Sequence, residues 1–268
     1  MDIGAGKGAI TKILAEKCAK VIAYEQDAYI ANILRNEVGD NPKVEIIEMD
    51  FTRERLPKEP YSVFSNIPFS KTSTIINKLL FSNYPPEQAY FFVQKEAALR
   101  YMGFGEGKLI SLLLEPVFNV DIVHAFNKTD FEPAPSVNVV MISFEKKQKP
   151  EIDKFNIGEY ADFVSYCMVQ QKPSLFYRTN KLFTPEQFKR LAKSLNFDLD
   201  IIAKALPYQI WKKLFEYYLT GVENKKKQLT IGAFSKYINT KDNQKKSHRT
   251  KIRFNYSKNS LPNRSQSS

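Results

Sequence analysis

A glycine-rich loop, Gly4-Ala5-Gly6-Lys7-Gly8, stands near the start of the chain, and apolar runs of strand and helix periodicity alternate after it. This alternation indicates a doubly wound α/β domain with a mostly parallel sheet. We expect helices over residues 9–18, 28–37, 72–81, 96–101 and 109–114, and strands over residues 21–24, 44–47, 63–65, 90–93, 117–125 and 137–144. The last two strands should close the sheet in the antiparallel direction, and residues 103–107 should form a mobile loop.

From residue 157 the periodicity becomes helical, which predicts a second, small all-α domain with helices over residues 160–169, 185–195 and 208–219. We therefore expect a catalytic domain over residues 1–147, a helical domain over residues 155–221 and a tail over residues 222–268. The tail holds 12 Lys and Arg against 2 Asp and Glu, so it carries +10 of the net charge of +11. Its polar, weakly patterned sequence predicts disorder. It could attract phosphate, or it could serve only to keep the protein soluble.

The composition of the chain limits its domain sizes, its cellular location and the kinds of site it can hold. A chain of 268 residues with 43% hydrophobic residues can bury the core of one full domain and a smaller one. Without a signal peptide or a long apolar run, the sequence indicates a cytoplasmic protein. Cys18 and Cys167 lack metal-ligand spacing, so we expect no metal.

The glycine loop is compatible with more than one ligand. A phosphate-binding loop requires Gly-Lys followed by Ser or Thr, whereas Gly8 and Ala9 follow Lys7 here. A dinucleotide or S-adenosylmethionine would each suit the loop, and either would use Glu25, at the end of the second strand, to hold ribose hydroxyls. Asp50 follows the third strand and favours S-adenosylmethionine, because it can accept a hydrogen bond from an adenine amine. Alternatively, Asp50 could have only a structural role, as the residue that caps a helix or turn ahead of Thr52.

The tetrad Asn66-Ile67-Pro68-Phe69 follows a short apolar strand and suits a planar amine. Side-chain and backbone carbonyls of such a tetrad can accept both hydrogens of an exocyclic NH2 group, and the aromatic ring can stack on the base that bears it. Alone, the tetrad could equally be a turn that ends a strand. After a glycine loop and two strand-terminal acids, it predicts chemistry on a nucleobase.

The ordered motifs resemble those of the rRNA adenine N6-methyltransferase family, which includes the Erm-type resistance enzymes and the 16S dimethyladenosine transferases. The resemblance covers residues 2 to about 220 and rests on Asp2-Ile3-Gly4-Ala5-Gly6-Lys7-Gly8, Tyr24-Glu25, Met49-Asp50-Phe51, Asn66-Ile67-Pro68-Phe69, Gln94-Lys95-Glu96 with Arg100, and Phe131-Glu132-Pro133-Ala134-Pro135-Ser136-Val137. It implies a Rossmann-like domain that uses S-adenosylmethionine, followed by a small helical domain that helps to bind RNA.

The resemblance also implies residue roles. Cofactor contacts would come from Gly4, Gly6, Gly8, Glu25, Gln26, Asp50, Phe51 and Asn66. The target adenine would lie against Asn66, Ile67, Pro68, Phe69 and, as a second wall, Phe131, although Phe131 could instead be a core residue. Independently of the resemblance, the basic stretch over residues 172–193 makes Lys172, Arg178 and Lys181 candidates for phosphate contact, as are Lys95 and Arg100; the alternative for all five is a charged surface that faces water.

Within the family, Ile67 favours the Erm branch, because 16S enzymes usually carry Leu there, and the helical segment over residues 163–183 also looks Erm-like. The implied substrate is one adenine of 23S rRNA, whose methylation blocks macrolides, lincosamides and streptogramin B. The runner-up is 16S rRNA, which Gln94-Lys95-Glu96 would suit. We expect a monomer.

The chain departs from the family at its start, where three residues precede Gly4 instead of a full strand and an upstream segment. We expect a misassigned start or a genuine N-terminal truncation. If this chain is the whole protein, the central strand is nearly missing, and we expect weak cofactor binding and poor stability. Two other classes stay open. An NAD-dependent oxidoreductase would share the loop and Glu25 but would have no use for the tetrad, and a non-catalytic RNA-binding protein would need no methyl donor.

Overall fold

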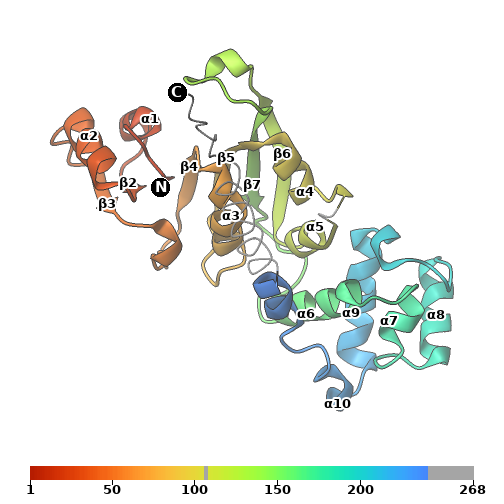
Figure 1. Ribbon diagram of the computed structural model, residues 1–268. Coiled ribbons are helices and arrows are strands. Elements are labelled where there is room, and N and C mark those ends of the chain that lie inside the picture. The colour runs from red at the N-terminus through yellow and green to blue at the C-terminus, as the bar shows by residue number, and fades with distance from the viewer. Residues whose placement is uncertain (106–107, 241–268) are drawn as a thin grey trace, which may run out of the picture. The chain divides into compact units, whose positions relative to one another are not determined.

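The structure is a computed structural model that describes residues 1–105 and 108–240 (Figure 1). The chain divides into two compact units. The first comprises Met1–Ile157 together with Pro207–Trp211, and the second comprises Gly158–Leu206 together with the chain from Lys212 on. The division falls a few residues after the boundary that the sequence predicts.

The first unit is a mixed α/β domain, as expected. Its strands are β1 (Asp2–Ile3), β2 (Val21–Glu25), β3 (Val44–Glu48), β4 (Ser62–Ser65), β5 (Gln88–Gln94), β6 (Phe118–Ala125) and β7 (Val139–Lys146), and its helices are α1 (Ala9–Lys17), α2 (Ala28–Val38), α3 (Thr72–Leu80), α4 (Lys95–Tyr101) and α5 (Lys108–Leu114). The pairs β1–β2, β2–β3 and β4–β5 are parallel, whereas β7 pairs antiparallel with both β5 and β6. The mostly parallel sheet with an antiparallel edge is confirmed.

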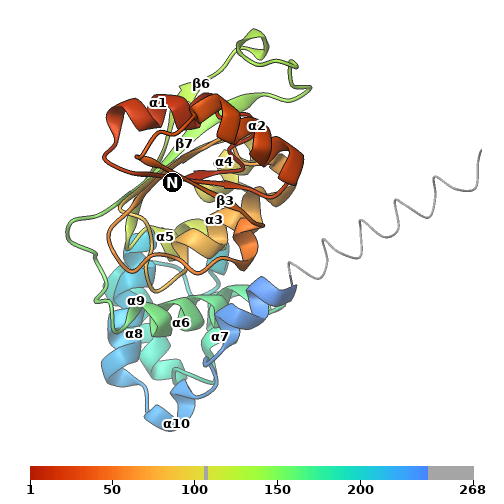
Figure 2. The ribbon, with the colours of Figure 1, turned by 90° about the vertical axis from the view of Figure 1, so that its left-hand side faces the viewer.

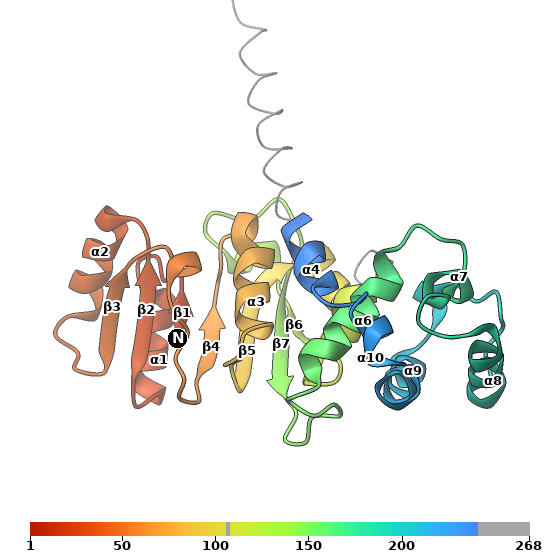
Figure 3. The ribbon, with the colours of Figure 1, turned by 90° about the horizontal axis from the view of Figure 1, so that it is seen from below.

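Strand β1 is only two residues long, yet it joins the two parts of the sheet. Ile3 pairs with Tyr24 of β2. On its other side, the Ile3 amide donates to Ser65 Oγ at 2.9 Å, and Ser65 Oγ donates to the Ile3 carbonyl at 2.6 Å. The Phe64 amide also donates to the Met1 carbonyl at 3.0 Å. A three-stranded sheet, β3-β2-β1, and a four-stranded sheet, β4-β5-β7-β6, therefore lie side by side and meet where β1 bonds to β4 (Figure 3). The central strand is short, as the sequence predicts, but its position is filled.

Helices cover both faces of the sheet, with α1 and α2 on one face and α3 on the other (Figure 2). The core between them includes the fully buried side chains of Leu79, Phe91 and Phe144. Because the carboxyl ends of neighbouring parallel strands meet at one edge of a sheet, the segments that follow β1, β2, β3 and β4 come together there. These four segments carry the four motifs of the sequence.

The second unit is helical. It contains α7 (Leu175–Thr179) and α8 (Pro185–Leu195) and most of α6 (Ile157–Val169) and α9 (Tyr208–Gly221). The five-residue helix α7 escaped prediction because it is shorter than two turns. Helix α8 starts with a capping box between Thr184 and Gln187, and Phe163 packs on Tyr218 with ring centroids 4.6 Å apart. Among the described residues, no helix is long and apolar enough to cross a membrane.

The sequence predicts that most of the segment from residue 222 is disordered, and the structure describes only the first part of that segment, up to residue 240, which contains helix. Helix α10 (Asn224–Lys227) is followed by a turn and by helical residues 233–240. The cause is a long-range contact: the Asp162 carboxylate accepts hydrogen bonds from the amides of Gly232 at 2.8 Å and Phe234 at 3.0 Å. Thr230 is buried and bonds to Tyr218 Oη at 2.9 Å. The rest of the predicted tail, from residue 241, and residues 106–107 of the predicted loop lie outside the described residues.

Candidate active site

The glycine loop joins β1 to α1 through backbone conformations that favour glycine. Gly4, Gly6 and Gly8 have φ values of 72°, 58° and 91°, in the left-handed region where side chains are strained. A Cβ atom on Gly8 would also lie 2.6 Å from Leu34 Cδ1. The Gly4 amide donates to the Tyr24 carbonyl at 2.8 Å, which anchors the loop to β2. The loop therefore offers backbone at close range to a ligand.

Glu25 ends β2 and fastens the loop through its side chain. Its Oε2 accepts from the Gly6 amide at 3.0 Å, and its Oε1 accepts from the amides of Gln26 at 2.8 Å and Asp27 at 3.0 Å. Asp27 in turn caps α2 by accepting from two amides of its first turn. Each Glu25 oxygen is thus held in a fixed direction, and Oε2 accepts one of these three bonds, which suits an acceptor for a ligand hydroxyl.

Asp50 follows β3 and caps the 3-10 helix η1 (Phe51–Arg53). Its Oδ1 accepts from the Thr52 amide at 3.0 Å and from Thr52 Oγ1 at 2.9 Å, and its Oδ2 accepts from Lys71 Nζ at 2.9 Å. Burial acts to raise the pKa of Asp50, but the bonds from Lys71 and Thr52 outweigh it and lower the pKa to about 2. Asp50 therefore does cap η1, but the cap uses only Oδ1 and not Oδ2.

A cavity of about 80 Å³ lies against these groups. Its walls include Gly4, Glu25, Gln26, Asp50, Phe51, Pro68 and Lys71. Phe51 is buried and meets the ring of Tyr24 edge-on at 5.0 Å between centroids. The structure thus brings most of the predicted cofactor residues to one place. A flat apolar wall, two carboxylates and close backbone are the chemistry that an adenosyl group requires.

The tetrad lies between β4 and α3. Ile67 is buried at 1% exposure, whereas Asn66 and Phe69 are exposed, Phe69 at 38%. The Pro68 carbonyl accepts from the Lys71 amide at 2.8 Å and so forms the 3-10 helix η2 (Phe69–Lys71). Pro68 also lies against the glycine loop, because a Cβ atom on Gly4 would be 3.2 Å from its Cδ. The buried Ile67 anchors a turn that leaves the side chains of Asn66 and Phe69 accessible.

Phe131 lies after β6, at the end of a 3-10 helix, η4 (Lys128–Asp130). It is half-buried and meets the rings of Phe126 and Phe92 edge-on, at 5.4 and 6.4 Å between centroids. Phe92 and Phe126 are themselves stacked at 5.0 Å. Phe131 is therefore fixed by other aromatic rings and keeps part of its surface exposed, so both interpretations of this residue are compatible with the fold.

The predicted phosphate contacts divide into two groups. Lys95 and Arg100 on α4 and Lys181 in the second unit have exposed side chains. Arg178 instead turns inward, where its guanidinium donates to the carbonyls of Cys167 at 3.1 Å and Met168 at 2.6 Å near the end of α6, and of Lys172 at 3.0 Å. Lys172 Nζ donates to the Tyr177 carbonyl at 2.8 Å.

These backbone bonds account for Arg178. Its guanidinium caps the end of α6, where the last carbonyls of a helix otherwise lack partners. We therefore replace the predicted phosphate contact of Arg178 by a structural role. Lys172 supports the same loop and is a weaker candidate than Lys181.

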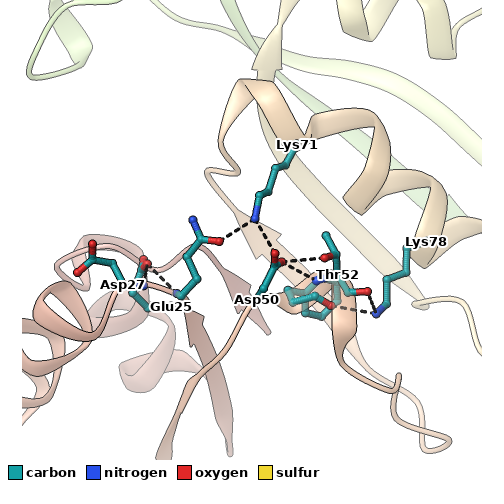
Figure 4. A network of polar contacts seen from close by, with 8 residues as sticks. Glu25, Asp27, Asp50, Thr52, Lys71 and Lys78 are labelled. Carbon is teal, nitrogen blue, oxygen red and sulfur yellow. Dashed lines mark hydrogen bonds and ion pairs between the residues drawn. The ribbon is translucent and has the colours of Figure 1, made fainter. Parts of the chain in front are cut away.

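Sequence reasoning missed two residues of this region. Lys71 reaches from η2 to Asp50 and, at 2.7 Å, to Gln26 Oε1 (Figure 4). Asp2 is buried at 1% exposure and accepts from Thr11 Oγ1 at 2.7 Å, whereas its Oδ1 has no hydrogen-bond partner among the residues that the structure describes. The available signals were a lysine two residues after the tetrad and an acid two residues before the glycine loop.

The ribosomal RNA adenine dimethylase family matches residues 1–219. The chain belongs to this family. It is an rRNA adenine N6-methyltransferase of the group that includes the Erm-type enzymes, and its cofactor is S-adenosylmethionine. The cavity residues fit this cofactor, as argued above.

Relatives of this methyltransferase carry two different names. An rRNA adenine N-6-methyltransferase of Bacillus anthracis is 29% identical over 80% of this chain and 75% of its own length. Ribosomal RNA small subunit methyltransferase A of Mycoplasmopsis pulmonis (strain UAB CTIP) is 31% identical over 80% of this chain and 86% of its own length. The crystal structure of the 23S rRNA methyltransferase ErmE superposes with a TM-score of 0.71 at 22% identity, covering 82% of this chain and 90% of that one, which confirms the fold.

Proposed function

We propose that this methyltransferase modifies N6 of one adenine of 23S rRNA and thereby gives resistance to macrolide, lincosamide and streptogramin B antibiotics. The observation that carries the choice of branch is the tetrad in its Asn66-Ile67-Pro68-Phe69 form, with Ile67 buried as the anchor of the turn. The similarity to the Bacillus anthracis enzyme supports it. The second candidate is 16S rRNA, supported by the small-subunit relative from Mycoplasmopsis pulmonis.

S-adenosylmethionine supplies an electrophilic methyl group on a sulfonium sulfur. In our proposal Glu25 accepts hydrogen bonds from the ribose hydroxyls, Asp50 accepts one from the adenine amine, and Gly4 exposes backbone to the methionyl part. Gln26 and Phe51 line the adenosyl pocket beside them. The lowered pKa of Asp50 supports this role, because the carboxylate stays charged as an acceptor throughout the neutral range.

Asn66 carries the catalytic part of the proposal. Adenine N6 is a poor nucleophile because its lone pair is delocalised into the ring. The Asn66 side-chain carbonyl and the backbone carbonyl of Ile67 or Pro68 would accept the two amine hydrogens, favour a pyramidal nitrogen and direct its lone pair. The Lys71 amide already uses one lone pair of the Pro68 carbonyl. No strong base is required.

Aromatic rings would hold the target base outside its stack. Phe69, at 38% exposure, is available to stack on an extruded adenine. Phe131 is our proposed second wall, and its ring is held by edge-on contacts with Phe126 and Phe92. Extrusion costs least from single-stranded RNA, so we infer an unpaired or easily opened target nucleotide.

Lys95, Arg100 and Lys181 are our proposed phosphate contacts, because exposed cations bind the RNA backbone without reading its sequence. We propose that the enzyme works as a monomer in the cytoplasm, on rRNA that ribosomal proteins have not yet covered. The basic residues before 241 could add to the same electrostatic attraction.

The decisive experiment is transfer of radiolabelled methyl groups from S-adenosylmethionine to protein-free 23S and 16S rRNA, with the modified base located by primer extension. We expect label on a 23S adenine of the drug-binding region, and a loss of about 100-fold or more for Asn66→Ala. Because Asn66 is exposed, that variant should keep its fold. Label at the 16S 3′ end would favour the second candidate, and label unaffected by Asn66→Ala would contradict the catalytic assignment.

A further inference from the structure

The side chain of Lys71 closes the cavity that we assign to the adenosyl group. Its Nζ lies 2.9 Å from Asp50 Oδ2 and 2.7 Å from Gln26 Oε1. Asp50 follows β3 and Gln26 follows β2, so the lysine bridges two segments from a third, the turn after β4. Figure 4 shows Lys71 reaching across to Asp50 from the start of α3. The bridge joins Gln26 and Asp50, two residues that line the cavity.

The bridge occupies the acceptor that the cofactor would need. Asp50 Oδ1 already accepts two hydrogen bonds from Thr52, so Oδ2 is the oxygen left for an adenine amine, and Lys71 holds it. The space beside the bridge is about 80 Å³, small compared with the roughly 300 Å³ at which ligand pockets of this kind begin. An adenine amine that donates to Oδ2 must therefore compete with Lys71 for that oxygen.

Holding the Asp50 loop in place does not require Lys71, because another lysine, Lys78 of α3, does so. Lys78 Nζ donates to the carbonyls of Phe51 at 2.9 Å and Thr52 at 3.0 Å, and also to the carbonyl of Glu54. Thr52 fixes the Asp50 carboxylate from within the loop. With the loop held in this way, the bond of Lys71 to Asp50 acts on the pocket and not on the fold.

The Lys71 bridge is also weak enough to open. The side chains of Lys71 and Asp50 are 30% and 31% exposed, and partly exposed ion pairs contribute little free energy because water competes with them. A ligand amine that donates to Oδ2 can replace the lysine, whereas the lysine ammonium can turn to water at the exposed edge of the pocket.

We propose that Lys71 is a gate and a selectivity residue of the cofactor pocket: it competes with the adenine 6-amine for Asp50, lowers the affinity for adenosyl ligands and lets the pocket close after product release. This inference rests on the proposed role of Asp50. It also has a chemical corollary. A base with a 6-carbonyl in place of the 6-amine has no donor at position 6 for Asp50, whereas that carbonyl can accept a hydrogen bond from Lys71, so the lysine should favour that base.

The test uses equilibrium binding by calorimetry of S-adenosylhomocysteine and S-inosylhomocysteine, which differ in that 6-substituent. We expect Lys71→Met to bind S-adenosylhomocysteine about three- to tenfold more tightly than the unmodified chain, because one charge-assisted competitor is lost. The same variant should bind S-inosylhomocysteine no better, so the ratio of the two affinities should rise. Thermal unfolding of Lys71→Met should match the unmodified chain, which shows that the variant is folded.

Lys146→Met is the matched control. Lys146 is also 30% exposed and forms an ion pair with Glu87 at 2.6 Å, but it lies on β7 away from the cavity walls. It should leave both affinities unchanged. Asp50→Asn should weaken the binding of S-adenosylhomocysteine both in the otherwise unmodified chain and in the Lys71→Met variant. This substitution tests the assignment of the pocket.

The outcomes separate the gate from the function beneath it. Unchanged or weaker binding of S-adenosylhomocysteine by Lys71→Met, with Asp50→Asn still damaging, would overturn the gate and leave the pocket assignment intact. Weaker binding would mean that Lys71 positions Asp50 for the adenine. Absence of binding by the unmodified chain and by Lys71→Met alike would overturn the pocket assignment and the gate with it.

Discussion

Gly4 and Pro68 lie so close that a methyl group on Gly4 would be 3.2 Å from Cδ of Pro68. One residue belongs to the glycine loop after β1, and the other belongs to the tetrad after β4. Since a Cβ atom at this distance would require Pro68 to shift by a few tenths of an ångström, the loop that would face the methyl donor and the turn that would face the target amine are packed closely together.

We expect Gly4→Ala to weaken S-adenosylhomocysteine binding by about tenfold or more, because it adds left-handed strain and pushes Pro68 out of place. Its φ of 72° should cost about 1–3 kcal/mol of stability as well. Gly39→Ala is the control, because Gly39 has a φ of 59° with nothing within 4 Å of a new Cβ. It should lose stability but keep cofactor binding, as measured by urea unfolding and calorimetry. Equal loss of binding in both variants would contradict the Pro68 argument.

The buried carboxyl of Asp2 should make the free energy of unfolding decrease as the pH rises. Burial raises the pKa of this carboxyl to about 6 from its ordinary 3.8, so the folded protein holds the proton more tightly than the unfolded chain. The resulting stabilisation is complete below about pH 4 and is lost as the pH rises through about 6, by up to about 3 kcal/mol. Asp2→Asn should remove this dependence and unfold at higher urea concentration than the unmodified chain at pH 7.

Urea unfolding between pH 4.5 and 7.5 measures the Asp2 effect as the difference between the two chains. The exposed Asp198 provides the comparison, because Asp198→Asn should leave the pH dependence of the unmodified chain in place. A constant difference between Asp2→Asn and the unmodified chain across this range would mean that the carboxyl titrates normally.

Substitutions of Arg178 and Lys181 should separate an effect on stability from an effect on RNA binding. Arg178→Met removes the donor to the Cys167 and Met168 carbonyls and should cost about 1–3 kcal/mol of stability. Lys181→Met changes an exposed side chain and should leave stability within about 0.5 kcal/mol. It should instead weaken RNA binding and reduce the salt dependence of log Kd by about one unit of slope. Filter binding at several salt concentrations measures the second effect, and an unchanged slope would count against the phosphate contact.

Asp162 should control the order of the chain around Gly232. Its carboxylate accepts from the amides of Gly232 and Phe234, so Asp162→Ala leaves two donors without their partner. We expect hydrogen exchange over residues 230–240 to accelerate about tenfold or more, since losing such bonds costs about 1–3 kcal/mol locally. Asp162→Asn keeps one acceptor and should show a smaller change. Exchange rates equal to those of the unmodified chain would mean that other contacts hold this segment.

The order of elements in the first unit and the choice of candidate site residues follow from the sequence alone. Alternating periodicity predicted the strands and helices of the first unit, and motifs placed directly after successive parallel strands had to meet at one edge of the sheet. The glycines, Glu25, Asp50 and the tetrad could be found because their chemistry depends on residue type and on distance along the chain, which a sequence states directly.

The directions of the long polar side chains depend on the tertiary fold. Lys71 bonds to residues 21 and 45 positions away, Arg178 turns inward to the end of a helix, and Asp162 orders residues 70 and 72 positions further on. Lysine, arginine and aspartate can face water, phosphate or backbone with similar local propensity. Which of these they meet depends on packing between segments distant in the chain, and that information appears only when the fold brings those segments together.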